Sequence, residues 1–171
     1  MLEEFCLLWR KLPQDEMGGI EMDYREAVQD LAPCGLDCSR CADHERGEIK
    51  QLSQRLRQLL GNYERLAQIK AAEKPAFEHY AHFSEILSLF ADGPSCGGCR
   101  SAQVKCPISC LAKTCHKEKK VDFCFQCGEY PCAEQFKDSR GLRKRWQENN
   151  DAMKETGVAA FHLEQKKRPR Y

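Results

Sequence analysis

Twelve cysteines among 171 residues constrain the fold of this chain more than any other feature of its sequence. All but one fall into two short regions, residues 34–41 and residues 96–132, while Cys6 stands alone near the start. Charged residues make up 31% of the chain and its mean hydropathy is −0.66, so the apolar material available for a core is limited. We therefore expect the clustered cysteines to supply much of the stability, and we expect Cys6 to have no part in a site.

The cellular compartment decides whether such cysteines form disulfides or bind metal. The first residues include Glu3 and Glu4, and they lack the basic start, long apolar run and small-residue cleavage site of a secretory signal. No window approaches the roughly 18 apolar residues of a membrane helix. These features predict a reduced, cytoplasmic setting without membrane association, in which thiolates serve as metal ligands.

Two short cysteine loops, Cys96-x2-Cys99 and Cys124-x2-Cys127, mark the second region. A Cys-x2-Cys loop places two thiolates on the same side of a tight turn, where they can share one tetrahedral ion. We favour the assignment that joins the two loops in a single site and gives a second site to the other four cysteines of the region. Interleaved and sequential pairings satisfy the same spacings. Those other four are Cys106, Cys110, Cys115 and Cys132.

The first region has the spacing Cys34-x3-Cys38-x2-Cys41, by which radical S-adenosylmethionine enzymes hold a 4Fe–4S cluster. Those enzymes build the motif into a barrel, whereas helical patterns follow Cys41 in this chain. We expect a structural site instead, because three ligands seldom close a site alone. Its fourth ligand would be His44 or a cysteine of the second region, Cys132 or Cys106, so the first region should fold back onto the second.

The ligand count leaves room for a histidine. Two four-cysteine sites use eight of the eleven clustered cysteines, and a third tetrahedral site would need His44 or His116, the histidines nearest to a cluster. Cysteine ligation suits zinc and a 4Fe–4S cluster alike, and we expect zinc, with the cluster as the alternative. The predicted metal ligands are Cys34, Cys38, Cys41, Cys96, Cys99, Cys106, Cys110, Cys115, Cys124, Cys127 and Cys132.

Two apolar stripes with helical spacing lie between the cysteine regions. One runs from Ile49 to Leu66 and the other from Ala76 to Phe90, each with steps of three and four residues. Gly61 lies off the first stripe, so we expect it to weaken that helix without breaking it, while Pro75 separates the two stripes. The pattern predicts an antiparallel hairpin over residues 45–91, packed stripe against stripe.

These signals predict a mainly α-helical protein with a loop-rich, cysteine-rich metal-binding module; a small α+β arrangement of that module is also compatible with them. Residues 1–21 read as a flexible extension and 22–136 as a metal-binding domain with its cysteine-rich module at 94–136. Residues 137–171 read as a helix, begun by Ser139 and ended by Gly157, and a basic tail that we expect to be extended over residues 165–171.

Three segments of the chain together resemble a known family. They are Ala32-Pro33-Cys34-Gly35-Leu36-Asp37-Cys38-Ser39-Arg40-Cys41, Cys96-Gly97-Gly98-Cys99, and Cys110-x4-Cys115-x8-Cys124-x2-Cys127-x2-Tyr130-Pro131-Cys132. In this order they are similar to DUF3795, a cysteine-rich prokaryotic family of unknown function, and the resemblance covers residues 32–136. It implies a metal-binding fold and no established activity.

The function indicated is binding rather than catalysis. Thiolate-only sites leave no position for an activated water, and the chain lacks Ser/His/Asp, phosphate-loop and His-Glu-x-x-His motifs. Residues 137–171 hold ten basic and five acidic side chains, a balance of +5. Residues 143–145 and 166–170 are therefore candidate phosphate contacts. We expect a binding or adaptor module whose partner is a protein or a nucleic acid; the alternative is an iron–sulfur redox or accessory protein.

Overall fold

The computed structural model describes residues 23–171, so the predicted extension at 1–21 and Cys6 lie outside the described residues. Within this part the chain is helical and forms no sheet, which confirms the mainly helical prediction. Two isolated bridges, Leu31 with Asp37 and His44 with Cys96, are the only β-type pairings in residues 23–171.

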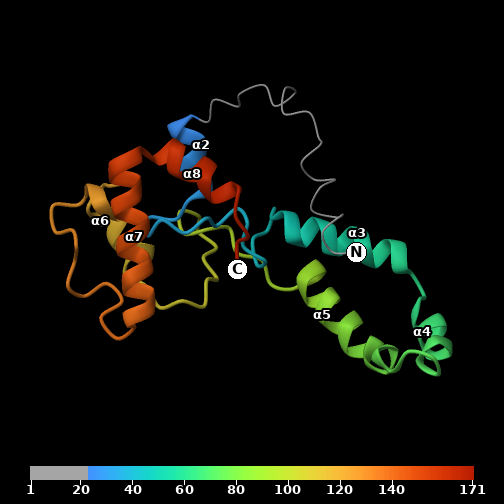
Figure 1. Cartoon of the computed structure of the whole chain (residues 1–171). Helices are drawn as coiled ribbons and strands as arrows, with labels where there is room; N and C mark the ends of the chain where they lie inside the picture. Colours follow the sequence, from blue (N-terminus) through green and yellow to red (C-terminus); the bar gives the residue numbers. More distant parts are fainter. Residues whose placement is uncertain (1–22) are drawn as a thin grey trace, which may run out of the picture.

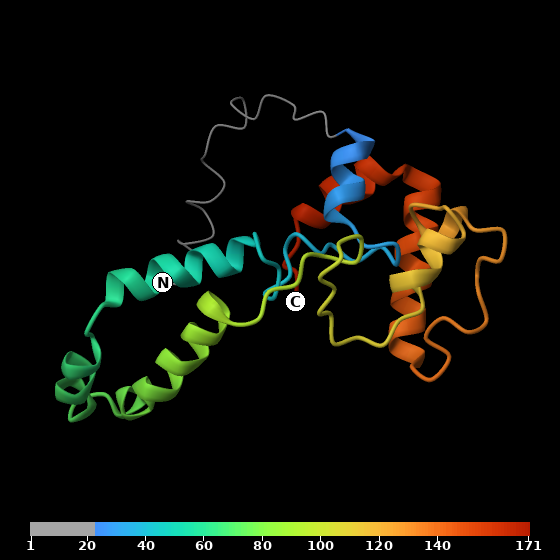
Figure 2. The ribbon, with the colours of Figure 1, turned by 180° about the vertical axis from the view of Figure 1, so that it is seen from behind.

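The described chain forms a compact body and a separate helical arm, which lie apart in both views (Figures 1 and 2). Long loops that carry the cysteines join the elements of the body. The body contains α2 (Tyr24–Asp30), α6 (Ala112–Glu118), the short 3-10 helix η4 (Cys124–Gln126), α7 (Arg140–Thr156) and α8 (Val158–Lys166). The arm contains α3 (Glu48–Leu60), α4 (Glu64–Ala71), the 3-10 helix η3 (Pro75–His79) and α5 (Tyr80–Asp92).

The arm is the helical hairpin that the two stripes predicted, with α3 packed against α5. One detail was wrong: Gly61 does break the first helix. It adopts φ +48 and caps α3 by donating its N–H to the Arg57 carbonyl at 3.1 Å, and α4 then begins separately at Glu64. A glycine adopts positive φ at little steric cost, so ending the helix there is easier than carrying glycine through its interior.

The contact between the hairpin helices also differs from the stripe-against-stripe prediction. Ser53 on α3 and Leu87 and Ala91 on α5 are buried, whereas most of the predicted stripe on α3 is exposed. The Gln54 side chain donates to the Ala91 carbonyl at 2.9 Å, and Arg57 pairs with Asp92. Small side chains let the two helices approach closely, so the bulky stripe is turned to one side and leaves an apolar face.

The body has two adjoining hydrophobic clusters. The first joins α2, α7 and α8 through Ala27, Leu31, Phe123, Met153, Val158 and Phe161. The second consists of Ala32, Cys34, Cys99, Ala112 and Trp146, with further cysteines of both regions partly buried around it. Trp146 is buried edge-on to Tyr130, with ring centroids 5.2 Å apart, so it packs in the core. Thiols therefore occupy core positions.

The turn after Pro33 presses the first cysteine region onto α7. Gly35 has φ +81, and a Cβ atom there would come within 2.7 Å of Asn149 Cβ and 3.0 Å of Met153 Cε. The Asn149 side chain donates to the Gly35 carbonyl at 3.2 Å. Only glycine fits this approach, so Gly35 fixes the position of the Cys34–Cys41 loop relative to α7.

Helix α7 begins and ends where the sequence predicted. The Ser139 hydroxyl accepts a hydrogen bond from the Leu142 N–H at 3.4 Å, and the helix stops before Gly157. The sequence analysis did not predict α8, which forms directly after Gly157 and runs to Lys166, so it includes the first two residues of the tail expected to be extended.

Replacing Ser139 by alanine removes this cap, and we expect a loss of about 1 kcal/mol in the free energy of unfolding. In a chain of this length that corresponds to roughly 2–4 °C in Tm, measurable by circular dichroism. Ser139→Asp keeps an acceptor at the same position and should preserve the wild-type Tm. Equal melting temperatures for Ser139→Ala and wild type would show that the cap contributes nothing.

Candidate metal centre

Seven cysteines from both sequence regions line one cavity beside the second hydrophobic cluster. Its other walls include the apolar side chains of Ala32, Leu36, Ile108 and Phe136. The first region thus folds back onto the second, as predicted. The seven are Cys34, Cys38, Cys41, Cys96, Cys99, Cys106 and Cys110.

The remaining four clustered cysteines line a second cavity, next to Trp146. Cys115 lies on α6, Cys124 is the first residue of η4, Cys127 directly follows η4, and Cys132 comes shortly after. The structure therefore groups the cysteines sequentially, and the two Cys-x2-Cys loops do not share a cavity as the favoured assignment expected. The division falls between Cys110 and Cys115, where α6 begins.

Within the first cavity two pairs of thiols are in direct contact. A hydrogen bond from the Cys99 thiol lowers the pKa of Cys38 to about 7, against the opposing effect of burial. The hydrogen bond between Cys34 and Cys110 likewise lowers the pKa of Cys110 to about 6, while it raises the pKa of Cys34. In each pair the hydrogen bond makes one sulfur the more acidic of the two, and the other sulfur keeps its proton.

Three sulfur atoms of this cavity receive hydrogen bonds from outside the cysteine set. The Lys105 N–H lies 3.3 Å from Cys96 Sγ, the Gln135 side-chain amide lies 3.0 Å from Cys110 Sγ, and the Tyr171 hydroxyl lies 3.5 Å from Cys41 Sγ. Donors at sulfur stabilise its negative charge and orient it, which is the usual role of groups around metal thiolates.

All eleven cysteines in the described part of the chain are free thiols. No group of three or more His, Cys, Asp or Glu side chains within residues 23–171 converges closely enough to hold a metal ion. The sulfur atoms approach one another in pairs. The chemistry of the donors in both cavities, soft sulfur with a neighbouring histidine, is that of zinc and iron–sulfur sites.

His44 is buried and lies on the wall of the first cavity. A Cβ atom at Gly98 would lie 3.8 Å from Cys38 Cβ and 3.9 Å from His44 Nε2, so this edge of the ring faces the cysteines. His44 Nδ1 accepts a hydrogen bond from the Arg46 N–H at 3.3 Å, which favours the tautomer with its proton on Nε2. That tautomer argues against His44 as a ligand, and leaves Cys106 as the better fourth partner of the first region.

The other two candidate ligands lie in the second cavity. Cys132 is separated from the first region, so it does not complete the site of Cys34, Cys38 and Cys41. His116 is buried beside Cys115, its Nε2 atom has no hydrogen-bond partner among the described residues, and burial lowers its pKa. A neutral imidazole with a free nitrogen is available there as an additional donor.

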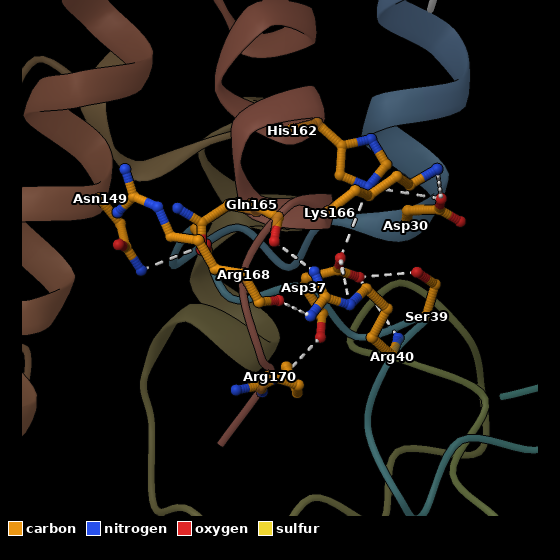
Figure 3. Close-up of polar contacts among 11 residues, drawn as sticks. Asp30, Asp37, Ser39, Arg40, Asn149, His162, Gln165, Lys166, Arg168 and Arg170 are labelled. Carbon is orange, nitrogen blue, oxygen red and sulfur yellow. Dashed lines mark hydrogen bonds and ion pairs between the residues drawn. The ribbon is translucent and has the colours of Figure 1, made fainter. Parts of the chain in front are cut away.

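A polar cluster that the sequence analysis missed ties α8 to the first cysteine region (Figure 3). Asp37 is 4% exposed and His162 is fully buried, with 3.6 Å between Asp37 Oδ2 and His162 Nε2. Asp30 lies 3.5 Å from the same nitrogen and 3.5 Å from Lys166 Nζ. Two acidic residues near the cysteines, together with a basic tail, are the only signal of this cluster in the sequence.

The tail beyond α8 is bound as well. The Arg40 guanidinium donates to the carbonyls of Gln165 and Arg168, and Arg170 Nε donates to the Asp37 carbonyl at 2.9 Å (Figure 3). The Tyr171 hydroxyl accepts the Ala42 N–H at 2.9 Å, so the end of the tail lies on the wall of the first cavity.

These contacts change the interpretation of the basic C-terminal segment. Two of the candidate phosphate contacts already have partners within the protein. Arg170 donates to the Asp37 carbonyl of the first cysteine region, and Lys166 pairs with Asp30. Arg143 donates to the carbonyls of Cys132, Ala133 and Gln135 at 2.9–3.1 Å, and so holds the loop after the second cavity. Nucleic-acid binding through this segment stays a hypothesis, with fewer free cations to support it.

Fold and site together define a small helical protein with thiol-lined cavities in its core. Among the residues that the structure describes, no helix has the length and apolar character needed to cross a membrane. The chain belongs to DUF3795, a family described as "Protein of unknown function", whose model matches residues 30–137. This confirms the family resemblance, and the match includes every clustered cysteine. No curated protein and no solved structure matches the chain.

Proposed function

We propose that this protein binds structural zinc through its clustered thiolates and acts as a binding or adaptor module. The observation that carries the proposal is the gathering of the eleven described cysteines, all free thiols, around two cavities of a small core. The apolar clusters of the body are modest, so metal would supply the stability that a larger core would otherwise provide.

The second cavity fits one closed zinc site. Its four cysteines, Cys115, Cys124, Cys127 and Cys132, match the four positions of a tetrahedral ion. A closed tetrathiolate site has no open position for a reacting water, which supports a structural rather than a hydrolytic role.

The first cavity has seven sulfur donors, enough for two four-coordinate ions if one thiolate bridges them. The pairs Cys38 with Cys99 and Cys34 with Cys110 would be brought together by the metal, since no three donors of the described residues converge without it. Hydrogen bonds from Lys105, Gln135 and Tyr171 would offset part of the negative charge of so many thiolates.

An iron–sulfur cluster in the first cavity is the alternative. Hydrogen bonds to cysteine sulfur also tune the reduction potential of such clusters, and these three donors would do so here. Protein purified without oxygen separates the two possibilities, because zinc protein is colourless and cluster protein is brown.

Metal analysis of paired variants tests both the proposal and the grouping of the cysteines. We expect the double variant Cys115→Ser with Cys132→Ser to lose one equivalent of zinc, because both substitutions remove a thiol ligand from the second cavity. Cys96→Ser with Cys124→Ser should reduce metal content in both cavities, so its loss should equal the sum of the two single variants. Cys6→Ser is the matched control and should retain the wild-type content.

Anaerobically purified protein without zinc or iron would overturn the proposal. If Cys96→Ser with Cys124→Ser lost no more metal than either single variant, the two loops would share one site and the grouping would be wrong.

A further inference from the structure

The arm exposes a band of large apolar side chains. Leu52, Leu56 and Leu59 on α3 are 60%, 42% and 67% exposed. Phe83, Ile86 and Phe90 on α5 are 46%, 52% and 41% exposed. We call these six residues the arm face.

The two stripes of the arm face lie on the same side of the hairpin. Successive residues of an α-helix are rotated by roughly 100° about the helix axis. Seen down its own axis, each stripe therefore lies about 40–120° to one side of the buried residue of that helix, which is Ser53 on α3 and Leu87 on α5. The direction of this rotation is the same on both helices. Because α3 and α5 run antiparallel, the same sense of rotation brings both stripes to one side. A groove on this side, lined by Leu56, Leu60, Tyr63, Phe77, Tyr80 and Phe83, joins them.

The area of the arm face matches one side of a stable interface. Aromatic side chains offer about 150–250 Å² each, and with the lower end of that range taken for all six residues these exposed fractions leave on the order of 500 Å² of apolar surface in water. A standard interface takes about 800 Å² from each partner, of which about 450–520 Å² is apolar. The arm face therefore supplies the apolar part of such an interface without any other element.

The charges of the arm favour an identical partner. Arg57 on α3 and Asp92 on α5 already pair with each other within the hairpin. Of the other charged residues, helix α3 carries Lys50 and Arg55 against Glu48, which is two minus one, or +1. Helix α5 carries Glu85, or −1. A two-fold axis parallel to the helices would place each α3 along the α5 of the second copy, so opposite charges meet and neighbouring helices run antiparallel.

We propose that the arm face binds the arm face of a second copy, and that the two hairpins form a four-helix bundle. The arm face contains no cysteine, so this contact is independent of metal binding.

Light scattering after size-exclusion chromatography of the full chain at about 10–100 μM tests the proposal. The expected mass is twice 19.7 kDa. Leu52→Glu with Ile86→Glu should reduce it to the monomer mass, because each dimer would bury four carboxylates. Both side chains are exposed in the monomer, so circular dichroism and metal content should stay unchanged. Gln58→Glu, on another side of α3, is the control and should remain dimeric.

A wild-type chain that stays monomeric over this range would overturn the proposal. The proposal also fails if Leu52→Glu with Ile86→Glu remains dimeric, since the contact would then lie elsewhere. If removing residues 1–22 turned a monomer into a dimer, that segment of the chain would be the occupant of the arm face instead of a second copy.

Discussion

Removing the metal should unfold the cysteine-rich loops of the body, residues 94–132. This segment forms no sheet, its longest helix has seven residues, and its cysteines occupy core positions beside Trp146. Structural zinc contributes roughly 10–16 kcal/mol of apparent binding free energy in zinc-finger peptides, more than the whole stability of most domains. We expect the cooperative thermal transition of the body to disappear on chelation, together with amide protection in residues 94–132.

The unfolding should be specific to the metal ligands and reversible. Cys124→Ser with Cys127→Ser should reproduce the loss around the second cavity without a chelator. Addition of zinc to the chelated wild type, under reducing conditions, should restore the transition, because metal binding and folding are coupled. Unchanged circular dichroism and melting in protein shown to be free of metal would refute the dependence of folding on metal.

Replacing Asp37 by alanine should cost about 1–3 kcal/mol of stability, the largest effect that we expect from a residue other than cysteine. The substitution leaves the fully buried His162 with Asp30 as its remaining carboxylate neighbour, and Arg40 loses a partner at 3.9 Å. Burial raises the pKa of Asp37, but the close approach of His162, the hydrogen bond from Ser39 at 2.6 Å and the charge of Arg40 outweigh it. Its pKa therefore lies below the ordinary value, as expected of a well-stabilised carboxylate.

The matched control is Asp92→Ala on the arm. Asp92 pairs with Arg57 but its side chain is 55% exposed, so this change should cost no more than about 1 kcal/mol. Urea unfolding gives both values, and amide exchange should quicken at residues 38–42 and in α8 of the Asp37→Ala protein alone. Equal losses for the two variants would mean that the buried cluster does not hold α8 to the cysteine loop.

Local signals in the sequence predicted the local structure. Ser139 marks the start of α7 and Gly157 marks its end, through their own backbone and side-chain chemistry. Pro75 likewise begins η3. These boundaries need no information from distant residues. The prediction for Gly61 was wrong because glycine either tolerates a helix interior or ends the helix, and the choice depends on the loop that follows. The stripes identified both helices but not the sides that meet, because small residues such as Ser53 carry little hydrophobic signal.

The grouping of the cysteines is a property of the tertiary structure. The spacing of Cys96-x2-Cys99 fixes two neighbouring sulfurs, but whether they meet Cys38 or Cys124 depends on where α6 and α7 place the loops. The polar cluster of Asp37 and His162 joins residues far apart in the sequence, so no local pattern can indicate it.

The hydrophobic core extends past the boundary of the family match at residue 137. Trp146 and Met153 on α7 and Phe161 on α8 are buried against residues inside the matched segment. Gly35, within that segment, can approach α7 closely only because it has no side chain. The unit that folds is therefore larger than the unit that is recognisable by its cysteines. A fragment cut at the edges of the recognisable segment would lack much of its own interior.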